Sequence, residues 1–125
     1  MNDKKFNKTR KSLRALLELD GIEYGISGGY WVKFSVIEVE LNKHRPLGIK
    51  YSLTMHNKHG TRLVGFDNAH LGDVKRKKFS AKRVEWDHKH NRNVISDYDF
   101  INIGRLIEDF WNLVDQILNE EGVET

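Results

Sequence analysis

Apolar residues between Ile103 and Asn119 recur every three or four positions, which is the period of an α-helix. They form one broad face, made of Ile103, Leu106, Ile107, Phe110, Leu113, Val114, Ile117 and Leu118. Asn102 is a suitable N-cap and Gly122 a suitable end, so the helix is expected over about residues 103–121. Because such a face must be buried, this helix is expected to cover a sheet.

The middle of the chain, about residues 30–95, has the pattern of an antiparallel sheet. Apolar side chains occupy every second position of Leu47–His56, which places them on one face of a strand. Short connections between consecutive strands imply a meander. The expected strands are about Tyr30–Leu41, Leu47–His56, Thr61–Asp67 and Arg83–His88, with Val94 and Ile95 as one more short fragment.

A basic helix is expected before the sheet, over residues 3–20. Its apolar stripe consists of Phe6, Leu13, Leu16 and Leu17, and Asp20-Gly21 is a plausible stop. Two helices packed on one sheet predict an α+β fold with an antiparallel sheet of about four strands. The length of 125 residues indicates a single compact domain over residues 1–125.

Composition narrows the classes of function. The chain is 38% hydrophobic and 31% charged, and no stretch approaches a membrane span. The absence of cysteine excludes disulfides and thiolate chemistry and fits a cytoplasmic protein. Eight lysines and arginines against two acids between Lys75 and Arg92 suggest an anionic partner, with RNA as the leading candidate. No cofactor is expected, and a homo-oligomer is compatible with the sequence.

Two polar clusters lie on either side of the basic residues 75–83, namely Asp67-Asn68-Ala69-His70 and Asp87-His88-Lys89-His90. A metal-independent ribonuclease needs a base for the ribose 2′-hydroxyl, an acid for the leaving oxygen and cations for the phosphate. The catalytic candidates are His88, His90 and His70, with Asp67 or Asp87 to orient an imidazole. The nucleic-acid-binding candidates are Arg62, Asn68, Lys75, Arg76, Lys77, Lys78, Lys82, Arg83 and Lys89.

Other interpretations use the same residues. His88 and His90, with Asp67 or His70, form a candidate ligand set for a divalent transition metal in a metal-dependent nuclease. A non-enzymatic module that binds nucleic acid or protein through its basic surface is a second alternative. Asp67-Asn68 also has the composition of a turn. His56 and His59, beside a predicted hairpin loop, are interpreted as surface residues, and the strand aromatics Trp31, Tyr51, Phe66 and Trp86 as core residues rather than base-stacking rings.

Four short motifs, in this order, resemble those of the TumE-type toxins. They are Lys50-Tyr51-Ser52-Leu53, Arg62-Leu63-Val64-Gly65-Phe66-Asp67-Asn68, Asp87-His88-Lys89-His90 and Asp109-Phe110-Trp111. The chain departs from shorter members in its basic insertion at 69–86 and its amino-terminal helix. The resemblance implies a toxin of a type II toxin-antitoxin module, restrained by a cognate antitoxin that is a small helix-turn-helix DNA-binding protein.

Overall fold

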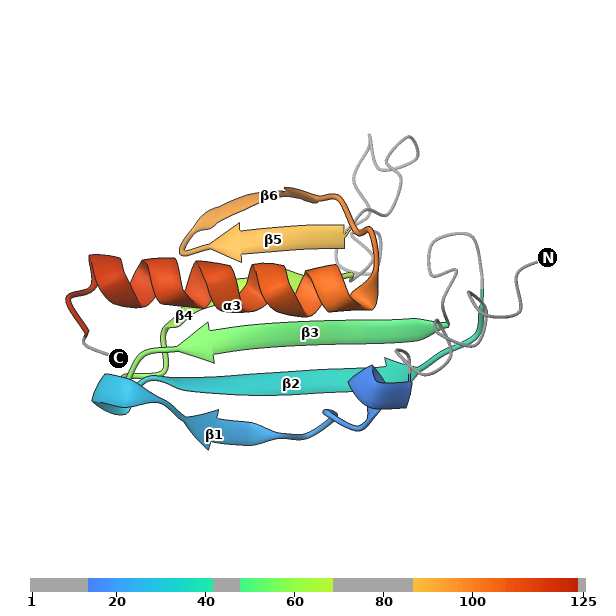
Figure 1. Cartoon of the computed structure of the whole chain (residues 1–125), viewed down its shortest axis with the longest axis horizontal. Coiled ribbons are helices and arrows are strands. Elements are labelled where there is room, and N and C mark those ends of the chain that lie inside the picture. The colour runs from blue at the N-terminus through green and yellow to red at the C-terminus, as the bar shows by residue number, and fades with distance from the viewer. Residues whose placement is uncertain (1–13, 42–47, 69–86, 124–125) are drawn as a thin grey trace.

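Six strands form one antiparallel sheet in the order β1-β2-β3-β4-β5-β6, which is also their order in the chain (Figure 1). The computed structural model describes residues 14–41, 48–68 and 87–123. The elements are β1 (Glu23–Gly25), η1 (Ser27–Gly29), β2 (Trp31–Glu38), β3 (Ile49–His56), β4 (Arg62–Asp67), β5 (Asp87–Asn91), β6 (Val94–Tyr98) and α3 (Ile103–Glu120). The predicted α+β class and the meander are confirmed, with six strands in place of about four.

The long helix α3 lies along one face of the sheet and crosses in front of β4 in Figure 1. The side-chain oxygen of Asn102 accepts a hydrogen bond from the backbone N–H of Arg105 at 2.8 Å and so caps its first turn. Seven residues of its apolar face are buried: Ile103, Leu106, Phe110, Leu113, Val114, Ile117 and Leu118. Burial of this stripe against the strands is the main favourable contribution to the fold.

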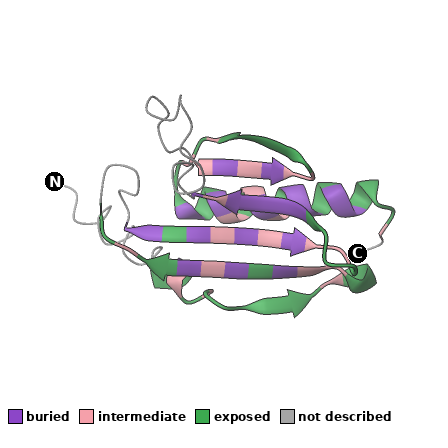
Figure 2. Ribbon diagram, turned by 180° about the vertical axis from the view of Figure 1, so that it is seen from behind, coloured by how far each residue is buried: buried purple, intermediate pink, exposed green. Residues whose placement is uncertain are grey.

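The two faces of the sheet differ sharply. On β3, Tyr51, Leu53 and Met55 are at most 3% exposed and point toward α3, while the residues between them point the other way. We call these two sides the helix face and the polar face. Figure 2 shows the sheet from behind, with α3 beyond the strands. No α-helix of the described ranges covers the polar face in that view.

Some elements differ from the sequence prediction. β1 was not expected, because its three residues are all exposed and therefore have no apolar period. The strand expected at Arg83–His88 corresponds to β5, which runs to Asn91, and residues 83–86 lie outside the described part. Of the expected amino-terminal helix, Arg14–Leu17 is helical and residues 3–13 are not described. Leu16, 1% exposed, joins the core.

Candidate functional site

β4 and β5 carry the polar side chains of the candidate site. In their antiparallel register, Asp67 lies opposite His88, and Gly65 lies opposite His90. Because side chains alternate along a strand, Asp67, His88 and His90 all project from the polar face. The side chain of Arg62, from the start of β4, reaches the same place. We call Asp67, His88, His90 and Arg62 the histidine-aspartate cluster.

One carboxylate serves both imidazoles. Its Oδ2 lies 2.8 Å from Nε2 of His90, and its Oδ1 lies 3.5 Å from Nδ1 of His88. The side chain of Asp67 is 18% exposed, so both contacts are partly shielded from water. A shielded carboxylate in this position orients each ring and stabilises a positive charge on either one.

The contact between Arg62 and His90 defines which ring nitrogen of His90 carries the proton. Nη2 of Arg62 lies 3.2 Å from Nδ1 of His90. A guanidinium can only donate, so Nδ1 must accept, and the ring proton is on Nε2, where it is donated to Asp67. In this arrangement Nδ1 of His90 faces a guanidinium that a phosphate could also attract.

Gly65 provides the space that the cluster occupies. A Cβ atom placed on Gly65 would lie 3.2 Å from Cδ2 of His90 and 3.5 Å from Cδ of Arg62. The first distance is shorter than an ordinary van der Waals contact, so any larger residue would displace the imidazole. Glycine in the middle of a strand often marks this kind of close approach.

Both histidines are buried, although they lie on the polar face. His88 is 5% exposed and His90 is 8% exposed. Nε2 of His88 is buried and has no hydrogen-bond partner among the described residues. A buried polar atom without a partner is costly, and such atoms often occur at functional sites. His88 therefore has Nδ1 directed at the Asp67 carboxylate and a buried Nε2 without a partner in the described part of the chain.

Asp87 does not join the cluster. It precedes His88 by one position and projects from the helix face, where the hydroxyl of the buried Tyr51 donates a hydrogen bond to its Oδ2. Burial raises the pKa of Asp87, and the hydrogen bond from Tyr51 only partly opposes that effect. Burial and the neighbouring Asp87 carboxylate also raise the pKa of Tyr51. The pair is a partly buried link between β3 and β5.

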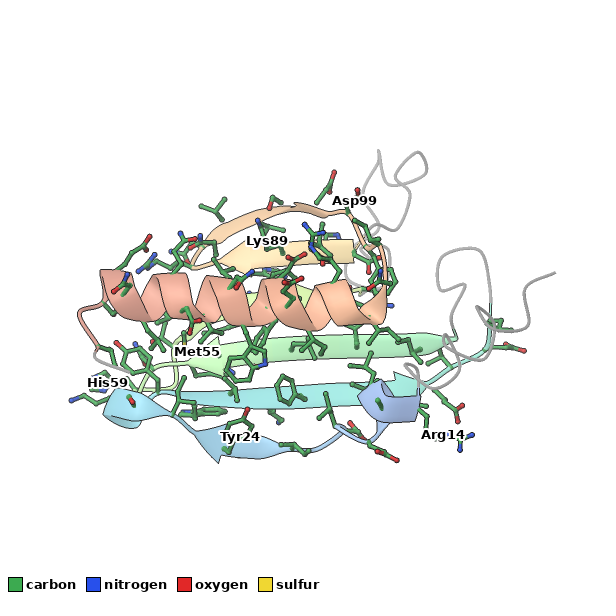
Figure 3. All side chains as sticks on the ribbon, in the orientation of Figure 1. Arg14, Tyr24, Met55, His59, Lys89 and Asp99 are labelled. Atoms are coloured by element: carbon green, nitrogen blue, oxygen red, sulfur yellow. The ribbon has the colours of Figure 1, made fainter. Side chains whose placement is uncertain are left out.

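Lys89 also projects from the helix face, beside α3 (Figure 3). It lines an open groove of about 290 Å³ together with Phe66, Tyr98, Asp109, Asn112, Leu113 and Gln116. Within this groove, Asp109 accepts hydrogen bonds from the hydroxyl of Tyr98 at 2.6 Å and from Nε of Arg105 at 3.0 Å. Lys89 therefore lies on the face of the sheet opposite His88 and His90.

The side chain of Asn68 holds the backbone of β3. Its Oδ1 accepts the backbone N–H of Tyr51 at 2.9 Å, and its Nδ2 donates to the carbonyl of Ile49 at 3.0 Å. The side chain thus continues the pairing of β3 and β4 past the end of β4.

The other candidates, His70, Lys75, Arg76, Lys77, Lys78, Lys82 and Arg83, lie outside the described residues. Within residues 14–41, 48–68 and 87–123, no three histidine, aspartate or glutamate side chains are arranged as a metal-ligand set.

The comparison with protein families now adds to this geometry. The family model described as "Toxin TumE" matches residues 3–118. The chain belongs to the TumE toxin family. A toxin family implies, in general, an antitoxin partner. The searches of curated proteins and of solved structures returned no match. No helix in the described part of this TumE-family chain is long and apolar enough to cross a membrane.

Sequence reasoning missed two residues of the polar face in this TumE-family chain. His56 was interpreted as a surface residue and Trp31 as a core residue, yet their rings stack with centroids 4.1 Å apart. The register pairs Trp31 with His56, and His56 with Arg62, so the stack continues the row that leads to the histidine-aspartate cluster. Its signal in the sequence was the alternation of β3, which places His56 on the side opposite Met55.

Proposed function

We propose that this TumE-family chain is the toxin of a type II toxin-antitoxin module and acts as a metal-independent, histidine-dependent ribonuclease. The observation that carries the proposal is the position of Asp67 between the imidazoles of His88 and His90. Two oriented imidazoles can serve as base and acid near neutral pH. Arg62, which contacts His90, supplies the adjacent cation for a phosphate.

The reaction is an internal transesterification. A base removes the proton of the ribose 2′-hydroxyl, and the 2′-oxygen attacks the adjacent phosphorus. The bond from phosphorus to the 5′-oxygen breaks, and an acid protonates that oxygen as it leaves. The products are a 2′,3′-cyclic phosphate and a free 5′-hydroxyl, so no oxidant, metal or cofactor enters the balance.

We assign His90 as the base, because its Nδ1 carries the lone pair that Arg62 holds. When the guanidinium turns to the phosphate, that lone pair becomes free for the 2′-hydroxyl. We assign His88 as the acid, because Asp67 lies 3.5 Å from its Nδ1 and, among the described residues, its Nε2 has no partner. Asp67 is then a positioning residue that acts through both rings.

Burial of the two histidines favours a second candidate function. At 5% and 8% exposure, His88 and His90 meet little solvent in the structure, as expected for residues that support a surface rather than react at it. In this case the chain is a non-enzymatic binding module with a basic surface. The two candidates differ in one outcome only, namely whether a phosphodiester bond is broken.

For the partner, we propose that the cognate antitoxin is a small helix-turn-helix DNA-binding protein. This proposal rests on the family to which the chain belongs. The basic segment at Lys75–Arg83, which lies outside the described residues, is the proposed contact for an acidic or helical antitoxin segment. Retained antitoxin binding after these lysines are neutralised would count against it.

The test is induced expression in a bacterial host, with growth and intact RNA followed together. The variants are wild type, His88→Ala/His90→Ala, and His59→Ala as a matched control from the exposed β3–β4 loop (Figure 3). Growth arrest with RNA fragmentation, lost only in the folded double variant, supports a histidine-dependent ribonuclease. RNA that stays intact while growth stops favours the binding module.

The purified chain separates the metal-free mechanism from the metal-dependent one. Cleavage of RNA in the presence of a strong chelator is expected to equal cleavage without it, since the assigned acid and base are side chains. Loss of cleavage with the chelator, restored by one divalent metal, would replace this mechanism with metal-dependent chemistry.

A further inference from the structure

Trp31 and His56 form a stacked pair on the polar face. Their rings lie at an interplanar angle of 13° with centroids 4.1 Å apart. Nε2 of His56 lies 3.0 Å from Oγ1 of Thr54, a contact that fixes the orientation of the imidazole. Trp31 is half-buried, so part of its ring system stays accessible. The imidazole covers one face of the indole.

On the side of Trp31 away from His56, β1 contributes Gly25, which has no side chain. Gly25 is the register partner of Trp31 in β1, on the side away from His56. Among the described residues, a Cβ placed on Gly25 would meet only the carbonyl oxygen of Tyr30 within 4 Å, at 3.9 Å. Among the described residues, the row therefore runs from His56 to Trp31 and then to an open position at Gly25.

Two cations and one carboxylate lie around this position. Lys33 lies two residues after Trp31 on the same face, with its side chain 51% exposed, and makes a long 3.8 Å ion pair to Glu23. Arg62 follows His56 in the register. Burial lowers the pKa of His56, and the nearby cations Arg62 and Lys33 act in the same direction against an opposing backbone hydrogen bond at Gly60. Within the described part of the chain, Arg62 and Lys33 are the cations nearest to the stacked pair.

We propose that Trp31 is a stacking platform for an unpaired base of single-stranded RNA, which enters the open position above Gly25. Aromatic rings beside cations are the elements with which proteins hold single strands, because every base has a stacking face. The row from Trp31 through His56 to Arg62 leads to His90, so the stacked base belongs to the strand whose phosphate reaches the histidine-aspartate cluster. The inference rests on the proposed action on RNA and names its substrate as single-stranded.

The experiment measures the affinity of the full chain for a short 2′-O-methyl oligonucleotide, which lacks the 2′-hydroxyl needed for cleavage. Single-stranded and duplex forms are compared by fluorescence anisotropy. Trp31→Leu removes the platform, Gly25→Val fills the open position, and Trp31→Phe keeps an aromatic face. Ile37→Ala, another exposed position on the same face of β2, is the matched control.

Trp31→Leu and Gly25→Val are each expected to weaken single-strand binding by roughly five- to one-hundredfold, the range for loss of one base-aromatic stack. Trp31→Phe, Ile37→Ala and all duplex affinities should change little. If Trp31→Leu fails to fold, Gly25→Val tests the same position. Its valine is tolerated by the backbone, because Gly25 has an ordinary strand conformation.

Unchanged single-strand affinity in folded Trp31→Leu and Gly25→Val overturns the inference, as does an equal loss for duplex. Weakened antitoxin binding with unchanged RNA affinity also overturns it and assigns the stack to a protein partner. Since the probe cannot be cleaved, this result is independent of whether the wild type breaks RNA. If single-strand binding depends on Trp31 but the wild type cleaves no RNA, the stacking inference stands and the proposed ribonuclease activity is wrong.

Discussion

Gly65 and His90 are opposite each other in neighbouring strands, and the imidazole lies so close to the glycine that a Cβ there would be 3.2 Å from its Cδ2. The hydrogen bond from His90 to Asp67, 2.8 Å long, depends on the ring staying in that place. A residue without any functional group therefore helps to set the geometry of the histidine-aspartate cluster.

Gly65→Ala is expected to reduce toxicity and RNA cleavage by roughly tenfold or more, because a displaced base loses most of its proton-transfer efficiency. The fold should survive, since the required shift is a few tenths of an ångström. Cleavage rate and circular dichroism check these two expectations. Gly104→Ala in α3 is the control, because its Cβ would meet only Asn102 Oδ1 at 3.5 Å. Full activity in Gly65→Ala would show that His90 does not act as the base.

Arg62→Lys and Arg62→Ala test the role of the guanidinium. Lysine keeps the charge but loses the planar fork that reaches His90 and, in the proposed mechanism, a phosphate, so cleavage is expected to fall in both variants. Alanine should in addition reduce the salt dependence of RNA binding, because one phosphate contact is lost. Binding isotherms at several salt concentrations measure this slope. Equal slopes for wild type and Arg62→Ala would show that Arg62 does not contact phosphate.

The sequence predicted those elements whose apolar and polar side chains alternate regularly. The apolar period of α3 and the clean alternation of β3 predicted both elements, because burial on one face leaves a regular trace. β5, Asp87–Asn91, has no apolar residue, so its extent depends on pairing with β4 and β6. His88 and His90 are two residues apart, so the sequence alone placed them on the same face of an extended strand. The same spacing places Asp87 and Lys89 on the other face. That Asp67 lies on the histidine side required the register between β4 and β5, which no local pattern encodes.

The partly buried pair of Tyr51 and Asp87 predicts a pH-dependent contribution to stability. Folding raises the pKa of Asp87, so its ionised form lowers the stability of the folded state at neutral pH. This penalty disappears as the pH falls below the ordinary aspartate value of 3.8. Asp87→Asn keeps an acceptor for the Tyr51 hydroxyl and should unfold at higher denaturant than wild type at neutral pH, with no advantage in acid.

Two further measurements test the roles of Tyr51 and Asp87. Tyr51→Phe leaves the carboxylate without its hydroxyl donor and is expected to cost about 1–3 kcal/mol of unfolding free energy. Asp87→Asn should keep full toxicity, because Asp87 projects from the face opposite His88 and His90. If a stable Asp87→Asn protein loses toxicity, Asp87 acts in the reaction and the division between the two faces is wrong.

Asn68→Ala separates a structural asparagine from one that binds RNA. Both polar atoms of its side chain bond the backbone of β3, at Ile49 and Tyr51, and the residue is 8% exposed. Removing them leaves two buried backbone groups without these partners, so a loss of about 2–4 kcal/mol in unfolding free energy is expected. RNA affinity of the folded protein should be unchanged. Asn119→Ala, at an exposed position of α3, is the control and should differ little from wild type. Weaker RNA binding with full stability in Asn68→Ala would instead place Asn68 in the RNA contact.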